Sequence, residues 1–208
     1  MNRRDETDPS AFDREFFDRF YRRRATRASG PEDFRRVSRF VLAYLDYLEI
    51  EVRTVLDLGC GLGRWKAALG EHDPRIRYTG VDISPWASKT YGWHRASVEG
   101  FRSDTRYDLV ICQDVLPYLP KPRLRQAIDN IASLTGQAAY LQVVTDEDWT
   151  GDACDPKRTD GSMNRFPASW YRRLLGRHFL NCGGGLFVPR DGGVVLWELE
   201  HCARGPRA

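Results

Sequence analysis

The sequence predicts an α/β fold, a doubly wound and mostly parallel sheet with an antiparallel C-terminal hairpin strand and an N-terminal helical extension. Short apolar segments alternate with amphipathic ones between residues 54 and 145, which is typical of parallel strands joined by crossover helices. Near the end, the pair Asp191–Gly192 separates two apolar runs, which favours a hairpin. Before residue 50, apolar residues recur only at helical spacing.

The first 50 residues contain two helical patterns. Aromatic side chains recur at positions 12, 16, 17, 20 and 21, between charged residues, which predicts an amphipathic helix. A capping box of Ser29 and Glu32, with Pro31 in the first turn, predicts the start of a second helix. Its apolar stripe runs from Phe34 to Leu48. These residues either close over the site as a lid or cover a flank of the sheet as a plain structural layer.

The elements of the sheet follow in order. Strands are expected at 54–58, 77–81, 94–97, 109–112, 138–145, 185–188 and 194–200. Helices are expected at 64–69 with Gly70 as the C-cap, and at 85–91, 121–134 and 167–175. Residues 150–166 are polar and irregular, and a loop of this length in a compact domain usually has a function.

Composition excludes several classes of protein. The net charge of +3 is too small to predict a nucleic-acid partner. No apolar run approaches the roughly 18–20 residues of a membrane span, and the N-terminus MNRRDETDPS lacks the apolar segment of a secretory signal. We therefore expect a cytoplasmic protein without a membrane partner. The sequence does not predict the oligomeric state.

The five cysteines do not predict a disulfide framework or a metal site. Their number is odd, and no two of them have the C-x-x-C spacing of a zinc site; they are Cys60, Cys112, Cys154, Cys182 and Cys202.

The strongest chemical signal is VLDLGCGLG at residues 55–63, where a buried strand runs into three alternating glycines. Glycine allows a ligand to lie against the backbone, and the following helix N-terminus presents free N–H groups. The third glycine comes one position too early for a dinucleotide fingerprint. Asp57 suits a cationic group, and Asp82 lies about 20 residues after the glycines, where an acid binds ribose. The pattern predicts a ribose-bearing ligand with a positively charged amino-acid end.

Residues 55–145 resemble the class I S-adenosylmethionine-dependent methyltransferases. VLDLGCGLG resembles the first motif of that superfamily, TGVDIS its second-strand acidic motif, and YDLVICQDVLPYL its fourth-strand motif. The resemblance implies a seven-stranded Rossmann-like sheet and S-adenosylmethionine as cofactor, with S-adenosylhomocysteine as product.

The resemblance also implies roles for individual residues. Asp57 would hold the amino end of the cofactor, Asp82 would bind the ribose hydroxyls, and Ile83 would cover the adenine. Ser97 stands where the family often has an acid beside the adenine amino group, with Val98 next to it. Gln113 would lie next to the methyl donor. The glycine loop completes the expected cofactor site with Gly59, Cys60, Gly61 and Gly63.

Methyl transfer from a sulfonium needs alignment and exclusion of water, and a general base only for a hydroxyl or a protonated amine. Tyr118 is the first candidate for a catalytic group, because many small-molecule methyltransferases that resemble this chain carry His there; packing against the next helix is the alternative. Asp146 follows the fifth predicted strand and is the second candidate. The candidates for acceptor binding are Phe17, Tyr21, Trp149, Arg158 and Arg165.

The prediction is therefore an S-adenosylmethionine-dependent methyltransferase acting on O or N of a small molecule. Residues 1–50 form a helical cap or lid, 51–203 the methyltransferase domain, and 204–208 a tail. One alternative is an RNA or tRNA methyltransferase, although [DN]-P-P-[YF] is missing at Gln113–Leu116, where enzymes that methylate amino groups of nucleic acids place it. The other is a non-catalytic protein that binds the cofactor.

Overall fold

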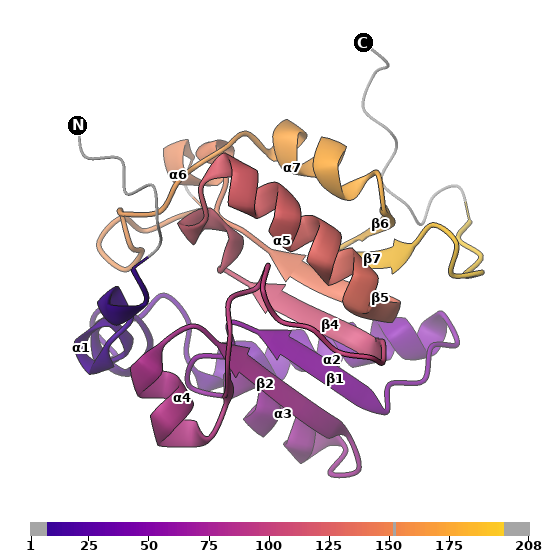
Figure 1. The fold of residues 1–208 in the computed structure, drawn as a ribbon, viewed down its shortest axis with the longest axis horizontal. Coiled ribbons are helices and arrows are strands. Elements are labelled where there is room, and N and C mark those ends of the chain that lie inside the picture. The colour runs from indigo at the N-terminus through magenta and orange to yellow at the C-terminus, as the bar shows by residue number, and fades with distance from the viewer. Residues whose placement is uncertain (1–7, 152, 198–208) are drawn as a thin grey trace.

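The computed structural model describes residues 8–151 and 153–197, which contain one seven-stranded sheet with helices on both faces (Figure 1). The strand order is β3-β2-β1-β4-β5-β7-β6. Strands β1 to β5 pair in parallel, and β7 runs antiparallel to both β5 and β6. This confirms the predicted fold class. The strands are β1 (Thr54–Leu58), β2 (Arg77–Asp82), β3 (His94–Arg95), β4 (Tyr107–Gln113), β5 (Thr135–Gln142), β6 (Phe179–Gly183) and β7 (Leu186–Pro189).

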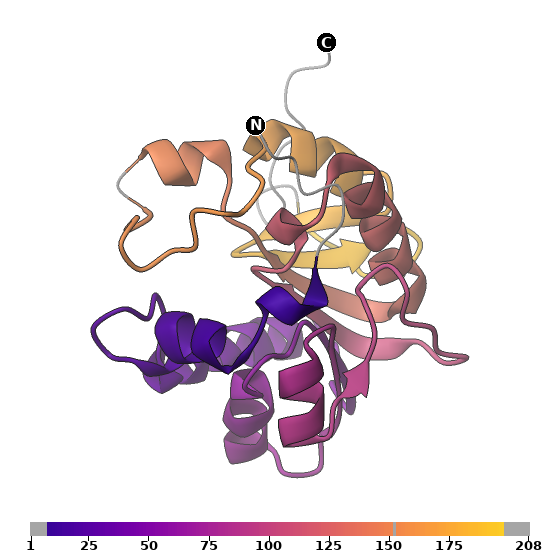
Figure 2. The same cartoon turned by 60° about the vertical axis from the view of Figure 1, so that its left-hand side comes forward.

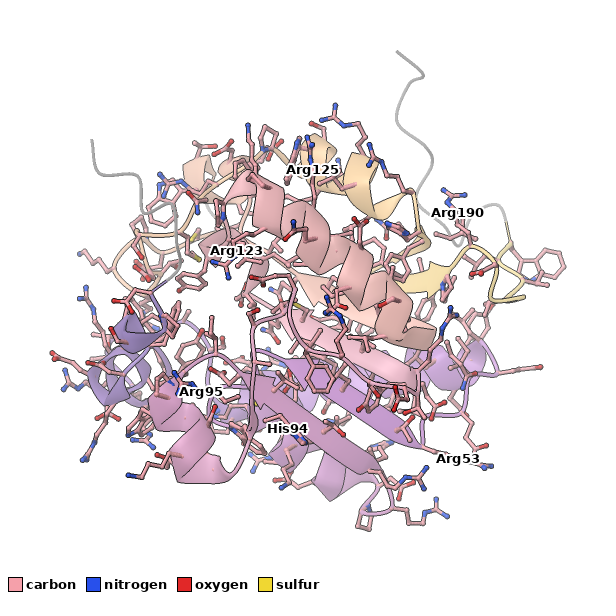
Figure 3. The ribbon with its side chains drawn as sticks, in the orientation of Figure 1. Arg53, His94, Arg95, Arg123, Arg125 and Arg190 are labelled. Carbon is pink, nitrogen blue, oxygen red and sulfur yellow. The ribbon has the colours of Figure 1, made fainter. Side chains whose placement is uncertain are left out.

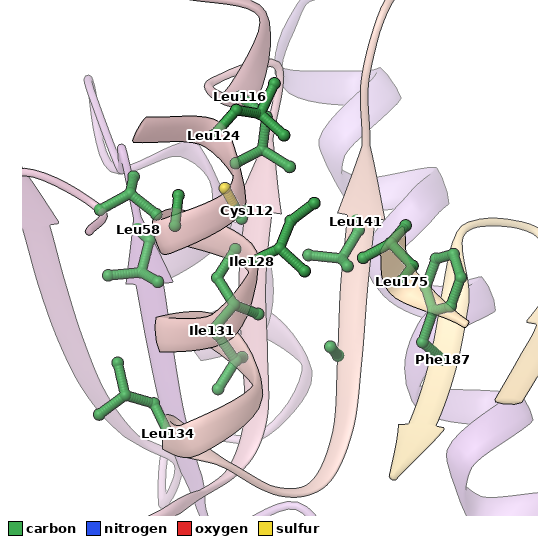
Figure 4. Close-up of a cluster of buried hydrophobic side chains, with 14 of the residues drawn as sticks. Leu58, Cys112, Leu116, Leu124, Ile128, Ile131, Leu134, Leu141, Leu175 and Phe187 are labelled. Carbon is green, nitrogen blue, oxygen red and sulfur yellow. The ribbon is translucent and has the colours of Figure 1, made fainter. Parts of the chain in front are cut away.

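Helices cover both faces of the sheet, so its central strands are apolar on both sides. Helices α2 (Pro31–Tyr47) and α3 (Arg64–His72) pack on one face, against Val55 of β1 and Leu109 and Ile111 of β4. Helices α5 (Lys121–Leu134) and α7 (Ala168–Leu175) pack on the other. Figure 4 shows α5 on this second face, with Ile128 and Ile131 directed at Cys112 and Leu141 of the sheet. Helix α4 (Pro85–Tyr91) connects β2 to β3.

The N-terminal aromatic pattern forms a helical run over residues 14–22, as predicted, but the run begins only after Phe12. A 3-10 turn, η1 (Pro9–Ala11), precedes it, and a short α-helix, α1 (Arg14–Phe17), continues directly into a short π-helix, η2 (Asp18–Arg22). The side chain of Asp13 accepts a hydrogen bond from the N–H of Phe16 at 2.9 Å, and this cap fixes the start of α1 after Phe12.

Two predicted helix ends are also wrong. Helix α2 is capped at Gly30, whose N–H donates to the Asp33 carboxylate at 2.8 Å, so Ser29 and Glu32 do not form the box. Pro31 determines this register, because a proline fits best at the first helical position. Helix α3 runs past Gly70, which therefore is not its C-cap, and ends at His72.

The C-terminal hairpin uses a different turn from the predicted one. Strands β6 and β7 are joined across Gly184 and Gly185, and Gly183, Gly184 and Gly185 all have positive φ angles (85°, 57° and 82°). Such angles are accessible to glycine at little cost, so the glycine run makes the tight turn. The Asp191–Gly192 pair instead follows β7, and residues 194–197 are not in a strand. Residues 198–203 of the predicted last strand and domain, and the tail at 204–208, lie outside the described residues.

Strand boundaries differ near the site as well. The third strand ends at Arg95 rather than at residue 97, and β5 ends at Gln142 rather than at 145. Thr145 instead caps a short helix, α6 (Asp146–Thr150), by accepting a hydrogen bond from the N–H of Asp148 at 3.3 Å.

Candidate cofactor and acceptor site

The carboxyl ends of β1, β2 and β4 meet at one edge of the sheet. The chain leaves β1 for one face and β4 for the other, so this edge is a switch point of the kind where open α/β sheets bind ligands. A cavity of about 70 Å³ lies here, between Gly59 after β1, Asp82 at the end of β2 and Gln113 at the end of β4. Ile83, Ser97 and Val98 line it further along.

Asp82 organises the glycine loop from the neighbouring strand. One of its carboxylate oxygens accepts the N–H of Gly61 at 2.7 Å, and the other accepts the N–H of Ser84 at 2.8 Å. Burial raises the pKa of Asp82, while these two hydrogen bonds oppose the rise. On the other side of the loop, Nε1 of Trp93 donates to the carbonyl of Gly61 at 2.9 Å. The loop is thus held at Gly61 by two long-range contacts.

A second cavity, of about 50 Å³, lies on the other side of Gly59 and is lined by Asp57, Cys60 and Gly61. The carboxylate of Asp57 is buried and accepts a hydrogen bond from the hydroxyl of Tyr78. Burial raises the pKa of Asp57 to about 7, the hydrogen bond from Tyr78 lowers it, and the nearby charge of Asp82 raises it. Two buried carboxyl groups therefore flank the glycine loop, and a cationic ligand end beside them would favour their charged forms.

Aromatic residues of the N-terminal segment cover this edge of the sheet. Phe17 is buried, with 4% of its surface exposed, and a Cβ built on Gly61 would lie only 3.0 Å from its Cε1 atom. Its ring also contacts Trp86, at 5.3 Å between ring centroids. Phe17 and Tyr21 thus line both cavities together with the glycine loop. Helix α2, the second helix expected in this region, instead packs on a face of the sheet.

A third cavity, of about 620 Å³, opens beside the first two. Figure 2 shows the segment from α6 to α7 facing the N-terminal helices, and side chains of both line this cavity. Tyr118 lies in its wall, and its hydroxyl donates to Oδ2 of Asp160 at 3.2 Å. The volume of this third cavity is within the range of roughly 300–1,000 Å³ that is usual for small-molecule pockets.

Asp114 lines all three cavities. It has a φ angle of 57°, which is uncommon for a residue other than glycine, and its N–H donates to the carbonyl of Gln142 at 2.8 Å. Burial raises the pKa of Asp114 to about 6; a hydrogen bond with Gln113 lowers it and the charge of Asp148 raises it. The strained backbone thus holds a carboxylate where the cavities meet.

Most of the residues that the sequence indicated meet at this edge. Nine line the first cavity, namely Phe17, Tyr21, Gly59, Asp82, Ile83, Ser97, Val98, Gln113 and Tyr118. Asp57, Cys60 and Gly61 line the second cavity, and Arg158 lines the third.

Four predicted residues lie elsewhere. Gly63 packs against Trp93, where an added Cβ would lie 2.8 Å from the ring. Asp146 begins α6 and lines none of the three cavities. Trp149 and Arg165 contact each other instead, with the guanidinium carbon 4.2 Å from the ring centroid, and neither lines these cavities.

The geometry fits the cofactor that the motifs imply. The backbone of Gly59 and Gly61, with φ angles of 82° and 49°, forms a surface on which a side chain would clash with Val115 or Phe17. Asp82 lines the first cavity and Asp57 the second, so carboxylates lie on both sides of this surface, as the resemblance implies for the ribose and amino ends of the cofactor.

Comparison with known families decides the class. A family model described as "Methyltransferase domain" matches residues 21–181, which is most of the chain. The chain belongs to this methyltransferase family. With this membership, the prediction of an S-adenosylmethionine-dependent methyltransferase of class I is confirmed.

Solved structures share the fold of this methyltransferase. The sugar N-methyltransferase KedS8 from Streptoalloteichus sp. is 18% identical, with a TM-score of 0.59 over 75% of this chain and 87% of that one. DesVI from Streptomyces venezuelae is 15% identical, with a TM-score of 0.58 over 76% and 91%. An O-methyltransferase family protein from Burkholderia thailandensis is 17% identical, with a TM-score of 0.57 over 78% and 59%. No match was found among curated proteins.

The part of the methyltransferase that the structure describes has neither a membrane-spanning helix nor a metal site. None of its helices has the length and apolar character needed to cross a membrane. Within residues 8–151 and 153–197, no three His, Cys, Asp or Glu side chains are grouped so that they could hold a metal ion.

Sequence reasoning missed two acidic residues of the site. Asp114 follows Gln113 in the fourth-strand motif, but its positive φ angle, which positions the carboxylate, has no signature in the sequence. Glu99 lies two residues after Ser97, and only the fold shows that Glu99 is among the residues that line the first cavity.

Proposed function

We propose that this methyltransferase transfers the methyl group to an amine nitrogen of a small-molecule acceptor, with a hydroxyl oxygen as the second candidate. The observation that carries the proposal is the position of Asp114 between the two small cavities and the large one. A group in this position touches both the methyl donor and the acceptor.

The charge of the large cavity favours a cationic acceptor. Among the described residues, four carboxylates line it and only one guanidinium, that of Arg158, which is 3.4 Å from the carboxylate of Asp155. The carboxylates are those of Asp114, Asp148, Asp155 and Asp160. The rings of Phe20, Tyr21 and Tyr118 lie in the same wall, and aromatic faces attract ammonium groups.

Asp114 accounts for the proton that such a reaction must remove. Bound S-adenosylmethionine supplies an electrophilic methyl group on a cationic sulfur. A protonated amine has no free lone pair, so the Asp114 carboxylate takes its proton before the nitrogen can attack. The nitrogen then bonds to the methyl carbon, and the pair of the broken carbon–sulfur bond stays on sulfur. Phe17 and Tyr21 exclude water from this step.

The activities by which two structural neighbours are named agree with this class of acceptor. KedS8 is described as a sugar N-methyltransferase, and CalS10 from Micromonospora echinaspora as an amino pentose methyltransferase. Both names concern those proteins, and they suggest amino sugars as the first compounds to test.

The test is a methyl-transfer assay with radiolabelled cofactor and matched pairs of acceptors, in which each amine is compared with its hydroxyl counterpart. We expect product from amines, and a rate that rises with pH through about 6 as Asp114 loses its proton. Asp114→Asn should remove this rise and lower kcat by about 100-fold, within the range found for general bases. Asp129→Asn, on the outer side of α5 next to His178, is the matched control.

Other outcomes would decide against the proposal. Product from the hydroxyl members only would favour the second candidate. Methylation of tRNA, with binding that weakens steeply in salt, would favour a nucleic-acid enzyme. Cofactor binding without any product across the panel would favour a non-catalytic binding protein.

A further inference from the structure

Trp65 brings a buried hydrogen-bond donor to the edge of the sheet that carries the three cavities. It is the second residue of α3, and only 3% of its surface is exposed. Its indole ring packs against Tyr140 of β5 and Phe34 of α2, at 5.1 and 6.1 Å between ring centroids. From this fixed position, Nε1 donates to Oε1 of Gln113, the last residue of β4, at 2.8 Å.

The bond from Trp65 decides which end of the Gln113 amide faces Asp114. An indole N–H can only donate, so the amide oxygen must face Trp65. The NH₂ group is then the end that remains for Asp114, the next residue, whose ionised carboxylate can only accept. Burial raises the pKa of Asp114, and the hydrogen bond with Gln113 opposes this rise. If the amide were turned end for end, its oxygen would face the carboxylate and repel it.

The titratable groups that interact with Asp114 come from several elements. They are the carboxylate of Asp148, the hydroxyls of Tyr21, Tyr118 and Tyr140, and the thiol of Cys112. Burial raises the pKa of each hydroxyl and of the thiol, so these groups are neutral near pH 7. The charge of Asp148 disfavours a second charge on Asp114.

Two guanidinium groups near the cavities have carboxylate partners of their own. Arg123 extends from α5 (Figure 3) and donates to Oε1 of Glu99 at 2.7 Å. Arg158 lies 3.4 Å from the carboxylate of Asp155. Neither cation is paired with Asp114, so the amide of Gln113 is left to favour the ionised form of this carboxylate.

We propose that Trp65 is a positioning residue for the reaction: its indole N–H holds the Gln113 amide with the NH₂ group directed at the Asp114 carboxylate, which is thereby kept ionised to take the proton of the acceptor. Trp65 acts through Gln113 and does not meet the proton itself. The inference rests on the proposed function, in which Asp114 is the base. It adds the contact that allows a carboxylate buried beside Asp148 to ionise near neutral pH.

The experiment follows the titration of Asp114 by carbon-13 NMR, in the full chain labelled at the carboxyl carbon of aspartate. The signal that is missing in Asp114→Asn belongs to Asp114, and in the unmodified protein we expect its midpoint at about pH 6. Trp65→Phe keeps an aromatic ring but loses the N–H donor. The midpoint should rise by about one pH unit, the effect of one hydrogen bond to a charged group. Gln113→Met should raise it by a similar amount.

A double variant shows whether Trp65 acts through Gln113. When Trp65→Phe and Gln113→Met are combined, the midpoint should be no higher than in Gln113→Met alone, because changes to one shared contact are not additive. Trp170→Phe is the matched control: it makes the same change in a partly buried tryptophan of α7 that packs against Phe166, and it should leave the midpoint in place. An unchanged midpoint in folded Trp65→Phe, or a rise in the double variant equal to the sum of the two single rises, would overturn the proposal.

The same bond can be observed without a change in the core. In Gln113→Met, Trp65 is intact, and the nitrogen-15 NMR signal of its indole N–H should shift because the proton has lost its acceptor. Thermal unfolding of each variant shows whether it is folded. If Trp65→Phe does not fold, an indole signal that is the same in Gln113→Met and in the unmodified protein still refutes the proposal.

Failure of the proposed function gives a different result. If the midpoint of Asp114 depends on Trp65 and Gln113 but no amine is methylated, the control of Asp114 by Trp65 stands and the proposed acceptor class is wrong. If amines are methylated with a pH profile that is the same in Trp65→Phe, the proposed function stands and the role of Trp65 is refuted.

Discussion

The carboxylate of Asp82, at the end of β2, accepts a hydrogen bond of 2.7 Å from the N–H of Gly61 in the loop after β1. The same carboxylate lines the cofactor cavity, so one side chain both shapes the glycine loop and faces the ligand. Binding of the cofactor and order in the loop are therefore coupled through Asp82.

Asp82→Asn should weaken binding of S-adenosylhomocysteine by about 10- to 100-fold. The amide retains the shape of the side chain. It loses the charge that we expect to accept the ribose hydroxyls, and it loses one of the two oxygens that hold the loop. Calorimetry measures the dissociation constant, and Asp129→Asn is the control because its side chain is 66% exposed, at α5. An unchanged constant in Asp82→Asn would contradict the assignment.

Phe17→Ala tests whether the N-terminal segment is a lid. Phe17→Ala removes the ring that lies against Gly61. Because loops that close over a site control how fast the ligand leaves, the dissociation rate of S-adenosylhomocysteine should rise by about tenfold. Stopped-flow displacement measures this rate. Leu45→Ala, a truncation in the buried face of α2, should cost stability without changing the rate. Equal rates in both variants would show that the segment is only a structural layer.

The pKa of Asp57 predicts how stability depends on pH. Burial raises this pKa to about 7 from the ordinary value of 3.8, so between these two pH values the folded protein binds a proton that the unfolded chain does not hold. The contribution of this group to the free energy of unfolding therefore falls as the pH rises from about 4 to 7. The groups around it are Tyr78, Asp82 and Cys60.

Asp57→Asn should accordingly reduce the loss of thermal stability between pH 5 and pH 8 relative to the unmodified protein. Asp73→Asn provides a control of opposite sign, because the hydrogen bonds from Arg75 lower the pKa of Asp73 to about 2. That variant should lose stability at pH 8 and change little at pH 2. Melting curves at several pH values measure this dependence. If the melting temperatures of Asp57→Asn and of the unmodified protein change with pH in the same way, the prediction is refuted.

A substitution of Tyr118 tests whether the large cavity binds the acceptor. Its hydroxyl donates to Asp160, so Tyr118→Phe removes a hydrogen bond in the large cavity while the ring stays in place. We expect kcat/KM for the acceptor to fall by about tenfold and the dissociation constant of S-adenosylhomocysteine to stay within about twofold. A loss of cofactor affinity instead would mean that Tyr118 serves the cofactor side or the packing of the segment.

The edge of the sheet that carries the site was predictable from the sequence. Gly59 directly follows β1, and Asp82 and Gln113 end β2 and β4; parallel strands place their carboxyl ends at one edge. The helical periodicity of α5 and the apolar residues on both faces of β1 and β4 predict that helices cover both faces of the sheet. These signals could be read from the sequence because they are local and repeat along the chain.

The remaining features depend on contacts between distant segments. The Asp13 cap makes the first helix begin after Phe12, and the glycine run at 183–185 forms the hairpin turn in place of Asp191–Gly192. Glu99 is bound by Arg123 and Asp114 by the carbonyl of Gln142, and both partners belong to other elements. Tertiary contacts of this kind have no period in the sequence.

The most direct test of the central claim is calorimetric titration of the purified chain with S-adenosylhomocysteine at pH 7.5. The structure predicts saturable binding of one molecule per chain in the micromolar range, with a dissociation constant that increases at least about tenfold in Asp82→Asn. Absence of binding, or binding that is the same in both proteins, would show that the glycine loop between β1 and β2 holds a different ligand.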